Sequence, residues 1–335
     1  MSSIAQYPFN RFKQANKMAT KVIIDTDPGI DDAMAILFAW LVPSIEIVGL
    51  TTIFGNVSVE HATENALRLV EMMGADIPVA MGARRPLVQD LREYPDYVHG
   101  KNGFGDVLLG KPTSKSLDIS AADFIIEQIM NHPNEISLVA IGPLTNLALA
   151  LKKEPAIKQN VKEVIFMGGA VTANGNVNPA AEANMISDPH AADIVVTSDW
   201  PVTMIGLDVS HQIVMTESYL KEVHNESSFA GSFLHDISGF YLDFHRQYGV
   251  DGIYTHDPST IAYLMDPNLF SIEEGEVRVV TEGIACGKTI MNRDQNKYGK
   301  TDWSGIPKLK VCMGVNNVGI LELYRKTFIN SKDNV

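Results

Sequence analysis

The sequence predicts an α/β fold with an open, mostly parallel, Rossmann-like sheet, helices on both faces and a small antiparallel addition. Three observations lead to this class. Short apolar runs of strand length alternate with helical patterns through the first two-thirds of the chain, no linker divides the series, and acidic, amide and glycine residues follow the apolar runs. Strand, loop and helix repeating at this spacing indicate βαβ units, in which the strands are parallel.

The first elements can be assigned in order along the chain. Residues 22–25 form a short apolar run that ends in an acid, as expected of a buried strand. Residues 31–41 are mostly apolar and predict a helix. Asp31 and Asp32 lie in its first turn, where the helix dipole favours acids. Residues 46–52 are rich in β-branched side chains and predict a second strand, and residues 60–73 have the spacing of an amphipathic helix.

The later elements continue this alternation and then depart from it. Helical patterns occur at residues 121–130, 145–151 and 191–197, and strand-like runs at residues 136–141, 164–167 and 202–205. After Ser210 the pattern changes to a long helical region, which we expect at residues 217–248. Three further strand-like runs are candidates for the antiparallel addition and lie at residues 277–281, 288–291 and 309–315.

Composition narrows the functional classes. The chain has 335 residues, with 27 Lys plus Arg against 40 Asp plus Glu and a net charge of −13, so we expect neither a nucleic acid nor an anionic membrane surface as a partner. Two cysteines cannot form a disulfide framework, which favours a reducing, cytoplasmic location. We expect a flexible tail at residues 1–20, with any targeting role left open, and a single domain at residues 21–330.

Polar residues gather where the predicted strands end. The segment Asp25-Thr26-Asp27-Pro28-Gly29-Ile30-Asp31-Asp32 follows the first strand. Gly55-Asn56, Gly142–Asn146 and Gly168–Ala170 follow later strands, with Glu182 and Asn184 further on. Ligands of open α/β sheets bind outside the carboxyl ends of the strands, so these residues predict a site at that edge.

The four aspartates at residues 25–32 carry the most chemical information. Carboxylates only a few ångströms apart raise one another's pKa unless a cation lies between them. Oxygen ligands of this kind favour Ca²⁺ or Mg²⁺. Helix capping would explain one or two of the acids but not four. The cluster is not an EF-hand, because Ile30 and Ile36 occupy the places of its glycine and glutamate.

The aspartate motif and several other segments of the chain match the sequence pattern of a known family. The stretch Asp25–Ala33 resembles the signature of the inosine–uridine preferring nucleoside hydrolases, most closely in the plant-type nucleoside N-ribohydrolases. Further matches occur in the family's order over roughly residues 21–330. They are Gly55-Asn56, His99–Gly103, Ile141–Asn146, Met167–Ala170, Gly175-Asn176, Asn178–Asn184 and His256-Asp257-Pro258.

The resemblance implies an open α/β fold, a tightly bound Ca²⁺ and hydrolysis of the N-glycosidic bond of ribonucleosides to ribose and free base, in nucleoside degradation and salvage. It implies that the Ca²⁺ is held by Asp27, Asp32, Asp257 and the backbone carbonyl of Ile141. Metal-bound water is easier to deprotonate. The expected catalytic residues are Asp27 as general base for that water, Asn56 to orient Asp27 or the water, and His256 to protonate the leaving base.

The remaining motif residues imply the substrate contacts. Ribose would be bound by Asp31, Asn176, Glu182 and Asn184, with Met167 beneath the sugar. Acids and amides suit hydroxyl donors, so we expect ribonucleosides to be preferred over 2′-deoxyribonucleosides. His99 lies in a glycine-rich loop that would close over the base.

Three features bear on the choice of base. Ala183 stands where many relatives carry an aromatic residue. Tyr248 and Arg246 are candidate base contacts, Tyr248 by stacking or hydrogen bonding. Trp40, Trp200 and Trp303 lie outside the matching motifs, which disfavours a pocket restricted to purines. Uridine is therefore the first expected substrate, followed by inosine and xanthosine.

Two alternatives remain. A Mg²⁺-dependent phosphohydrolase would use the pair Asp25 and Asp27, but the partner lysine that it needs is poorly matched, because Lys162 precedes its strand. The separate G-x-x-x-x-G-K-[ST] phosphate loop is absent. A binding protein that retains the fold would not need a complete acid–base set. A homo-oligomer, dimer or tetramer, is expected from the resemblance.

Overall fold

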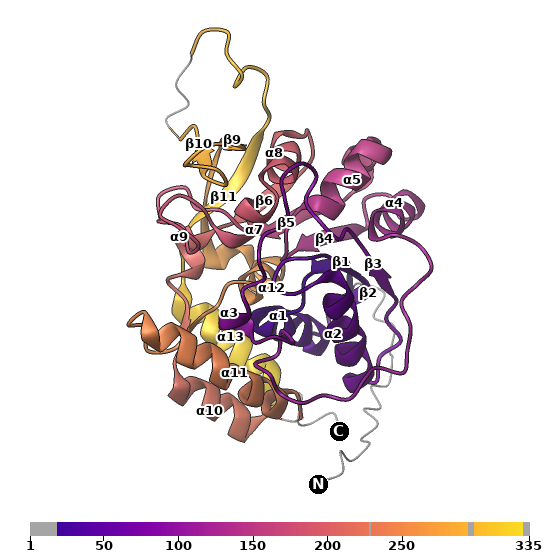
Figure 1. The fold of residues 1–335 in the computed structure, drawn as a ribbon, viewed down its shortest axis with the longest axis vertical. Helices are drawn as coiled ribbons and strands as arrows, with labels where there is room; N and C mark the ends of the chain where they lie inside the picture. Colours follow the sequence, from indigo (N-terminus) through magenta and orange to yellow (C-terminus); the bar gives the residue numbers. More distant parts are fainter. Residues whose placement is uncertain (1–18, 228, 294–297, 331–335) are drawn as a thin grey trace.

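The computed structural model describes residues 19–227, 229–293 and 298–330. Most of the expected tail, residues 1–18, lies outside this part of the chain. The central feature is a nine-stranded sheet with the order β10-β9-β11-β6-β5-β4-β1-β2-β3 (Figure 1). Its strands are β1 (Thr20–Thr26), β2 (Ile45–Thr52), β3 (Val79–Met81), β4 (Ile136–Ala140), β5 (Glu163–Met167), β6 (Val202–Ile205), β9 (Phe270–Val279), β10 (Thr289–Met291) and β11 (Lys308–Val315).

The strands from β3 to β11 in this order pair in parallel, and only β9 pairs antiparallel, with both of its neighbours. The predicted mostly parallel sheet is therefore confirmed. The antiparallel addition continues the edge of the main sheet. A separate two-stranded antiparallel sheet pairs β7 (Val214–Met215) with β8 (Ile253–Tyr254).

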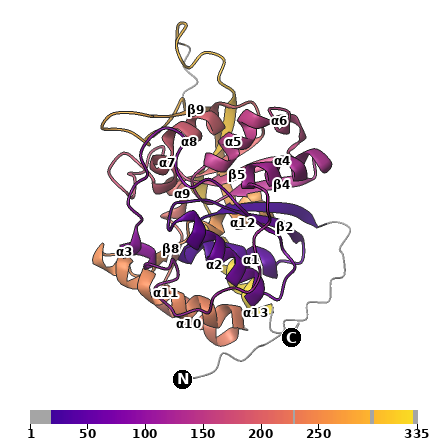
Figure 2. The same ribbon diagram turned by 45° about the vertical axis from the view of Figure 1, so that its right-hand side comes forward.

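Helices cover both faces of the sheet, as the alternation predicted (Figure 2). In β1, Val22 and Ile24 contribute to the apolar cluster on one face and Ile23 to the cluster on the other, because successive side chains of a strand point to opposite faces. The first face packs against α1 (Ile30–Leu41), α2 (Val59–Met72), α11 (Phe229–Gln247), α12 (Pro258–Met265) and α13 (Asn317–Asn330). The second packs against α4 (Ala121–Asn131), α5 (Thr145–Lys153) and α8 (Pro189–Thr197).

The remaining helices are short or peripheral. They are α3 (Asp96–His99), α6 (Ile157–Asn160), α7 (Ala183–Ser187), α9 (Leu207–Ser210), α10 (Glu217–Glu226) and the 3₁₀ helix η1 (Pro267–Leu269). Among the described residues no helix is long and apolar enough to cross a membrane.

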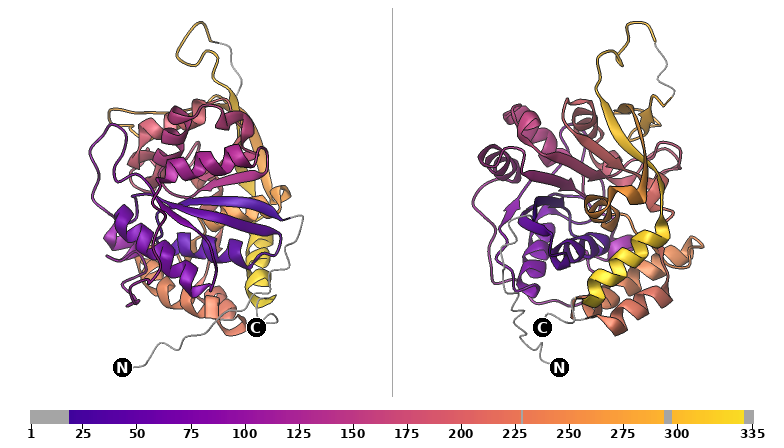
Figure 3. Two further views of the ribbon diagram at one scale, coloured as in Figure 1. Left: turned by 90° about the vertical axis from the view of Figure 1, so that its right-hand side faces the viewer. Right: turned by 180° about the vertical axis from the view of Figure 1, so that it is seen from behind.

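Two expectations for the second half of the chain need correction. The helical region 217–248 is two helices, α10 and α11, and α13 packs beside α10 and α1 (Figure 3). Strand β9 begins at Phe270, well before the expected start at residue 277. Its early part contains Glu273, Glu274 and Glu276 and therefore lacks an apolar strand pattern. Glu274 and Glu276 lie opposite Lys310 and Lys308 of β11, and such cross-strand charge pairs favour the strand.

Candidate active site

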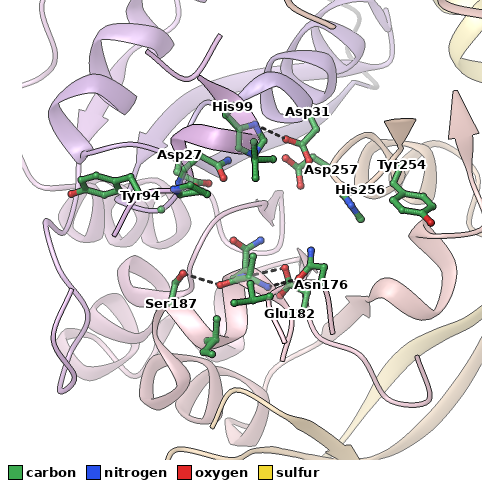
Figure 4. A pocket seen from close by; sticks show the side chains of 18 of the residues that line it. Asp27, Asp31, Tyr94, His99, Asn176, Glu182, Ser187, Tyr254, His256 and Asp257 are labelled. Carbon is green, nitrogen blue, oxygen red and sulfur yellow. Dashed lines mark hydrogen bonds and ion pairs between the residues drawn. The ribbon is translucent and has the colours of Figure 1, made fainter. Parts of the chain in front are cut away.

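A cavity of about 510 Å³ opens at the carboxyl edge of the parallel strands, where the sequence predicted a site. Loops after β1, β2, β4 and β5 contribute to its lining, together with α11 and the start of α12. The predicted site residues that line it are Asp27, Asp31, Asn56, His99, Ile141, Met167, Asn176, Glu182, Asn184, Tyr248, His256 and Asp257. Figure 4 shows Asp27, Asp31 and Asp257 on one side, facing Asn176 and Glu182 across the cavity.

Asp32 lies behind the lining and organises the turn between β1 and α1. Its Oδ1 accepts hydrogen bonds from the Thr26 hydroxyl at 2.5 Å and from the Asp27 amide at 3.2 Å. Its Oδ2 accepts from the Gly29 amide and from Asn56 Nδ2, both at 3.0 Å. The buried Asp32 carboxylate is thus tied to β1, to the helix start and to the loop after β2.

Asp27 is held against the backbone of two neighbouring loops. Its Oδ2 accepts a hydrogen bond from the Asn56 amide at 2.6 Å, so Asn56 orients Asp27 through its backbone rather than its side chain. A Cβ atom at Gly55 would lie 2.0 Å from Asp27 Oδ2, and one at Gly142 would lie 2.5 Å from Oδ1. These two loops therefore carry glycine because the carboxylate occupies the space that a side chain would need.

The aspartates form a group that fits a divalent cation. One oxygen from each of Asp31, Asp32 and Asp257 lies within 4.8 Å of the others, and all three residues are buried. Oδ1 of Asp27 and Oδ1 of Asp31 are buried without a hydrogen-bond partner among the described residues. Unpartnered buried carboxylate oxygens are expected where a cation binds.

The pKa values of these aspartates are raised, as expected where carboxylates are buried close together without a counter-charge. Burial and the Asp32 carboxylate raise the pKa of Asp31 to about 8. Burial, followed by the Asp32 carboxylate, also holds the pKa of Asp27 well above its usual range. Burial, followed by the Asp31 carboxylate, also raises the pKa of Asp257 well above its usual range. A bound cation would remove this cost by favouring the ionised carboxylates.

The ligand set implied by the resemblance overlaps this group without matching it. Asp31, which was assigned to ribose, lies in the tight group with Asp32 and Asp257, and Asp27 lies beside it. The Ile141 carbonyl accepts a hydrogen bond from Asn184 Nδ2 at 2.9 Å, which leaves a second lone pair available to a ligand.

The opposite wall is built around Glu182, the N-cap of α7. Its carboxylate accepts hydrogen bonds from the amides of Asn184, Met185 and Gly169, at 3.0, 3.1 and 3.0 Å. Asn176 Oδ1 accepts from the Ala183 amide at 3.0 Å, which fixes the loop before α7. These bonds arrange acid and amide groups along one side of the cavity.

Both predicted histidines are buried, and burial lowers the pKa of each ring. His99 Nδ1 accepts a hydrogen bond from the Ile30 amide at 3.2 Å, and burial lowers the pKa of His99 to about 3. His99 therefore lies against the start of α1 at the wall of the cavity. His256 Nδ1 lies 2.9 Å from the Ser210 hydroxyl, and burial, with His211 next in effect, lowers the pKa of His256 well below its usual value.

Sequence reasoning missed several aromatic and histidine side chains that line the cavity around His256. Tyr241 and His245 of α11, together with His211 and Tyr254, line the cavity around His256. The spacing of Tyr241 and His245 places them on one face of a helix, and that was the available signal. Which neighbour the face would meet depends on the tertiary structure.

Three expectations about individual residues change. Arg246 is wrong as a base contact, because it pairs with Glu217 and Asp243 and does not line the cavity. Tyr248 lines only the mouth, where it is 70% exposed and packs on Phe244. Asp25 lies outside the lining, because its Oδ1 accepts hydrogen bonds from the Thr51 hydroxyl at 2.5 Å and from Asn146 at 2.8 Å. A phosphohydrolase nucleophile at Asp25 therefore has no support from this geometry.

The comparisons with known proteins agree with one another. Residues 22–322 match the model of the family described as inosine-uridine preferring nucleoside hydrolase. Over 305 residues the chain is 45% identical to uridine nucleosidase 1 of Arabidopsis thaliana, covering 90% of this chain and 91% of that protein. A solved plant nucleoside hydrolase superposes with a TM-score of 0.90 at 42% identity, covering 92% of this chain and 99% of that one. A purine-preferring ribonucleoside hydrolase from Gardnerella vaginalis superposes with a TM-score of 0.87 at 34% identity, covering 94% and 100%.

Proposed function

The chain belongs to the inosine-uridine preferring nucleoside hydrolase family and is an enzyme that hydrolyses nucleosides. From this premise we propose that it cleaves the N-glycosidic bond of ribonucleosides, with uridine as its preferred substrate, and releases ribose and the free base. One observation carries the proposal: the buried aspartates face Glu182 and Asn176 across a single cavity, with His256 beside them.

Ca²⁺ is the proposed cofactor, because carboxylates and a carbonyl are ligands that this ion accepts in flexible geometry. Asp27, Asp32, Asp257 and the Ile141 carbonyl would hold it, and the position of Asp31 makes it a further candidate ligand. When bound, the cation would orient the ribose hydroxyls and make a water molecule easier to deprotonate.

Asp27 is the proposed general base. It lies against the loops of Gly55 and Gly142, so its carboxylate has little freedom to rotate. In the proposed step, water oxygen bonds to ribose C1′, the C1′–N bond breaks, and Asp27 takes the proton that the water loses. The sugar passes through an oxocarbenium-like state, which the surrounding carboxylates stabilise.

His256 is the proposed proton donor to the departing base. Burial disfavours the charged form of its ring and holds the pKa of His256 well below its usual value. With substrate bound, His256 takes up a proton from solvent. The electron pair of the broken bond then moves to the base, and the negative charge that develops there favours the protonated ring alongside it. The ring then returns to its neutral form when the proton reaches the base.

Glu182, Asn176 and Asn184 would bind ribose from the opposite wall, with Asp31 on the near side. A buried polar group that loses its hydroxyl partner pays a desolvation cost, so 2′-deoxyribonucleosides should be poor substrates.

The preference for uridine has two supports. The Arabidopsis thaliana relative is a uridine nucleosidase. Ala183 is small, and within the described ranges no tryptophan lines the cavity, so the pocket offers a purine no indole to stack on. Inosine and xanthosine are the next expected substrates.

The direct test is the release of reducing sugar from uridine, inosine, xanthosine, adenosine and cytidine, without phosphate, in buffer with Ca²⁺. Ribose from uridine, lost on adding a chelator and regained on returning Ca²⁺, is the expected result. A folded protein that releases ribose from none of the five would overturn the proposal. Sedimentation of the same sample tests the expected homo-oligomer.

A further inference from the structure

Helix α9 places a serine against the proposed proton donor. Ser210 is the last residue of α9, and its side chain is fully buried. Its hydroxyl oxygen lies 2.9 Å from Nδ1 of His256, a residue distant in the sequence. Within the described part of the chain this is the hydrogen bond that the His256 ring makes.

Packing alone does not decide which way the ring faces. His211 lies with its ring centroid 5.5 Å from that of His256, and Tyr254 lies at 5.8 Å. These rings restrict the plane of the imidazole. A half-turn of the ring about the bond to its Cβ would fill nearly the same volume while exchanging nitrogen for carbon positions. The hydrogen bond to Ser210 distinguishes the two orientations, and it leaves Nε2 as the nitrogen available to a ligand in the cavity.

A hydroxyl suits a ring that gains and loses a proton. It can donate to the lone pair of neutral Nδ1, and by turning its hydrogen away it can accept from a protonated Nδ1. A backbone carbonyl could only accept, and an amide N–H could only donate. Ser210 can therefore hydrogen-bond to Nδ1 in either ring tautomer, and its 2.9 Å contact favours the orientation in which Nε2 is left for the cavity.

The position of Ser210 is itself fixed by its neighbour in α9. The Asp208 carboxylate accepts hydrogen bonds from the amides of Val171, Thr172 and Ala173, at 2.7, 2.7 and 2.9 Å. These residues belong to the loop that follows β5. Helix α9 is short, but it is anchored to the rest of the site, and Ser210 is presented to His256 from a fixed support.

We propose that Ser210 is a positioning residue that orients His256 with Nε2 toward the nucleobase. The proposal rests on the proposed function, in which His256 protonates the departing base. In that step the C1′–N electron pair goes to the base, the proton moves from Nε2 to a base nitrogen, and His256 regains it from solvent. The Ser210 hydroxyl keeps its own proton throughout.

The test compares two substrates that differ in their need for a proton. Uridine requires protonation of its leaving base, whereas 4-nitrophenyl β-D-ribofuranoside releases a stable phenolate without it. General acid catalysis contributes about 10²–10⁴-fold, so losing the ring orientation should cost a part of that, about 10–100-fold. Ser210→Ala should therefore lower kcat for uridine about 10–100-fold at unchanged KM, and change kcat for the aryl riboside by less than about 3-fold.

Ser238→Ala is the matched control. Ser238 is a buried serine of α11 that does not line the cavity, and its hydroxyl donates to the Leu234 carbonyl within the same helix. This variant loses an equivalent hydroxyl and should keep both activities. If Ser210→Ala does not fold, as judged by circular dichroism, Ser210→Cys preserves most of the volume with a weak hydrogen bond and carries the same expectation.

The results separate this inference from the proposed function. Equal losses on both substrates, or no loss on uridine, would overturn the role of Ser210 while ribose release by the unmodified protein upholds the hydrolase. Failure of the unmodified protein to release ribose from uridine or from the aryl riboside would overturn the proposed function, and this inference with it.

Discussion

A substitution of Asp25 tests whether this buried aspartate has a structural role or takes part in catalysis. The substitution is Asp25→Asn. Oδ1 of Asp25 accepts hydrogen bonds from Thr51 and Asn146, whereas Oδ2 is buried without a partner among the described residues. Asparagine keeps the accepting oxygen and puts an uncharged amide in place of Oδ2. It therefore resembles the protonated form of the aspartate.

The expected effect on stability follows from the pKa. Burial raises the pKa of Asp25 from 3.8 to about 7. The native state therefore keeps a proton that the unfolded state has already lost, and the contribution of Asp25 to stability declines as the pH rises from about 4 to about 7. One pKa unit corresponds to about 1.4 kcal/mol, so the stability of Asp25→Asn relative to the unmodified protein should rise by roughly 2–3 kcal/mol between about pH 5 and about pH 8.

The assay is urea unfolding of both proteins across this pH range with Ca²⁺ present throughout, so that the aspartate cluster is held constant. Asp251→Asn is the control, because it removes a carboxylate from an exposed position and leaves the buried Asp25 network intact. A flat difference for Asp25→Asn would refute the reasoning. Ribose release by the same variant adds a second result: it should persist, whereas a phosphohydrolase that used Asp25 as nucleophile would lose its activity.

Four further predictions concern the cavity. Asp27→Asn should lower kcat for uridine by about 10²–10⁴-fold while circular dichroism stays unchanged; normal turnover would remove the base assignment. Glu182→Gln should raise KM or lower kcat for uridine by about 10-fold, since it replaces an acceptor of hydroxyl groups by an amide; unchanged constants would mean that Glu182 only caps α7. Chelation should lower the melting temperature, and Ca²⁺ should restore it, because a ligand of the native state stabilises by mass action; an unaffected melting temperature would argue against a resident cation. Turnover of 2′-deoxyuridine should be about 10⁴-fold slower than that of uridine, and equal rates would contradict the ribose contacts.

The sheet and the acidic motif could be predicted because both are local signals. Strands β1, β2, β4, β5 and β6 are apolar runs, and Asp27, Asp31 and Asp32 lie within one turn and helix start. Asp257 joins them from a distant helix, and no local pattern indicates that contact. It was expected only because the segment His256-Asp257-Pro258 resembles a family motif.

The residues that sequence reasoning assigned wrongly or missed depend instead on tertiary contacts. Arg246 directly follows His245 in α11, and adjacent residues of a helix point to different sides. His245 faces the cavity, so Arg246 faces α10, where Glu217 pairs with it. Ser210 marked only a change of pattern in the sequence, because a single serine carries no periodicity. Its partner His256 is identified only by the hydrogen bond that the fold forms between α9 and the segment before α12.

The position of Asp257 also bears on how the enzyme is made. Its partners Asp31 and Asp32 are synthesised more than two hundred residues earlier, and the strands between them build most of the sheet. A growing chain that still lacks residue 257 has an incomplete set of ligands and little to hold a cation. Once α12 packs against the sheet, Asp257 comes close to Asp31 and Asp32, and repulsion between the carboxylates destabilises the folded state. A cation bound by these ligands would therefore be taken up late in biogenesis, and a shortage of the ion would leave complete chains that are less stable and more open to proteolysis.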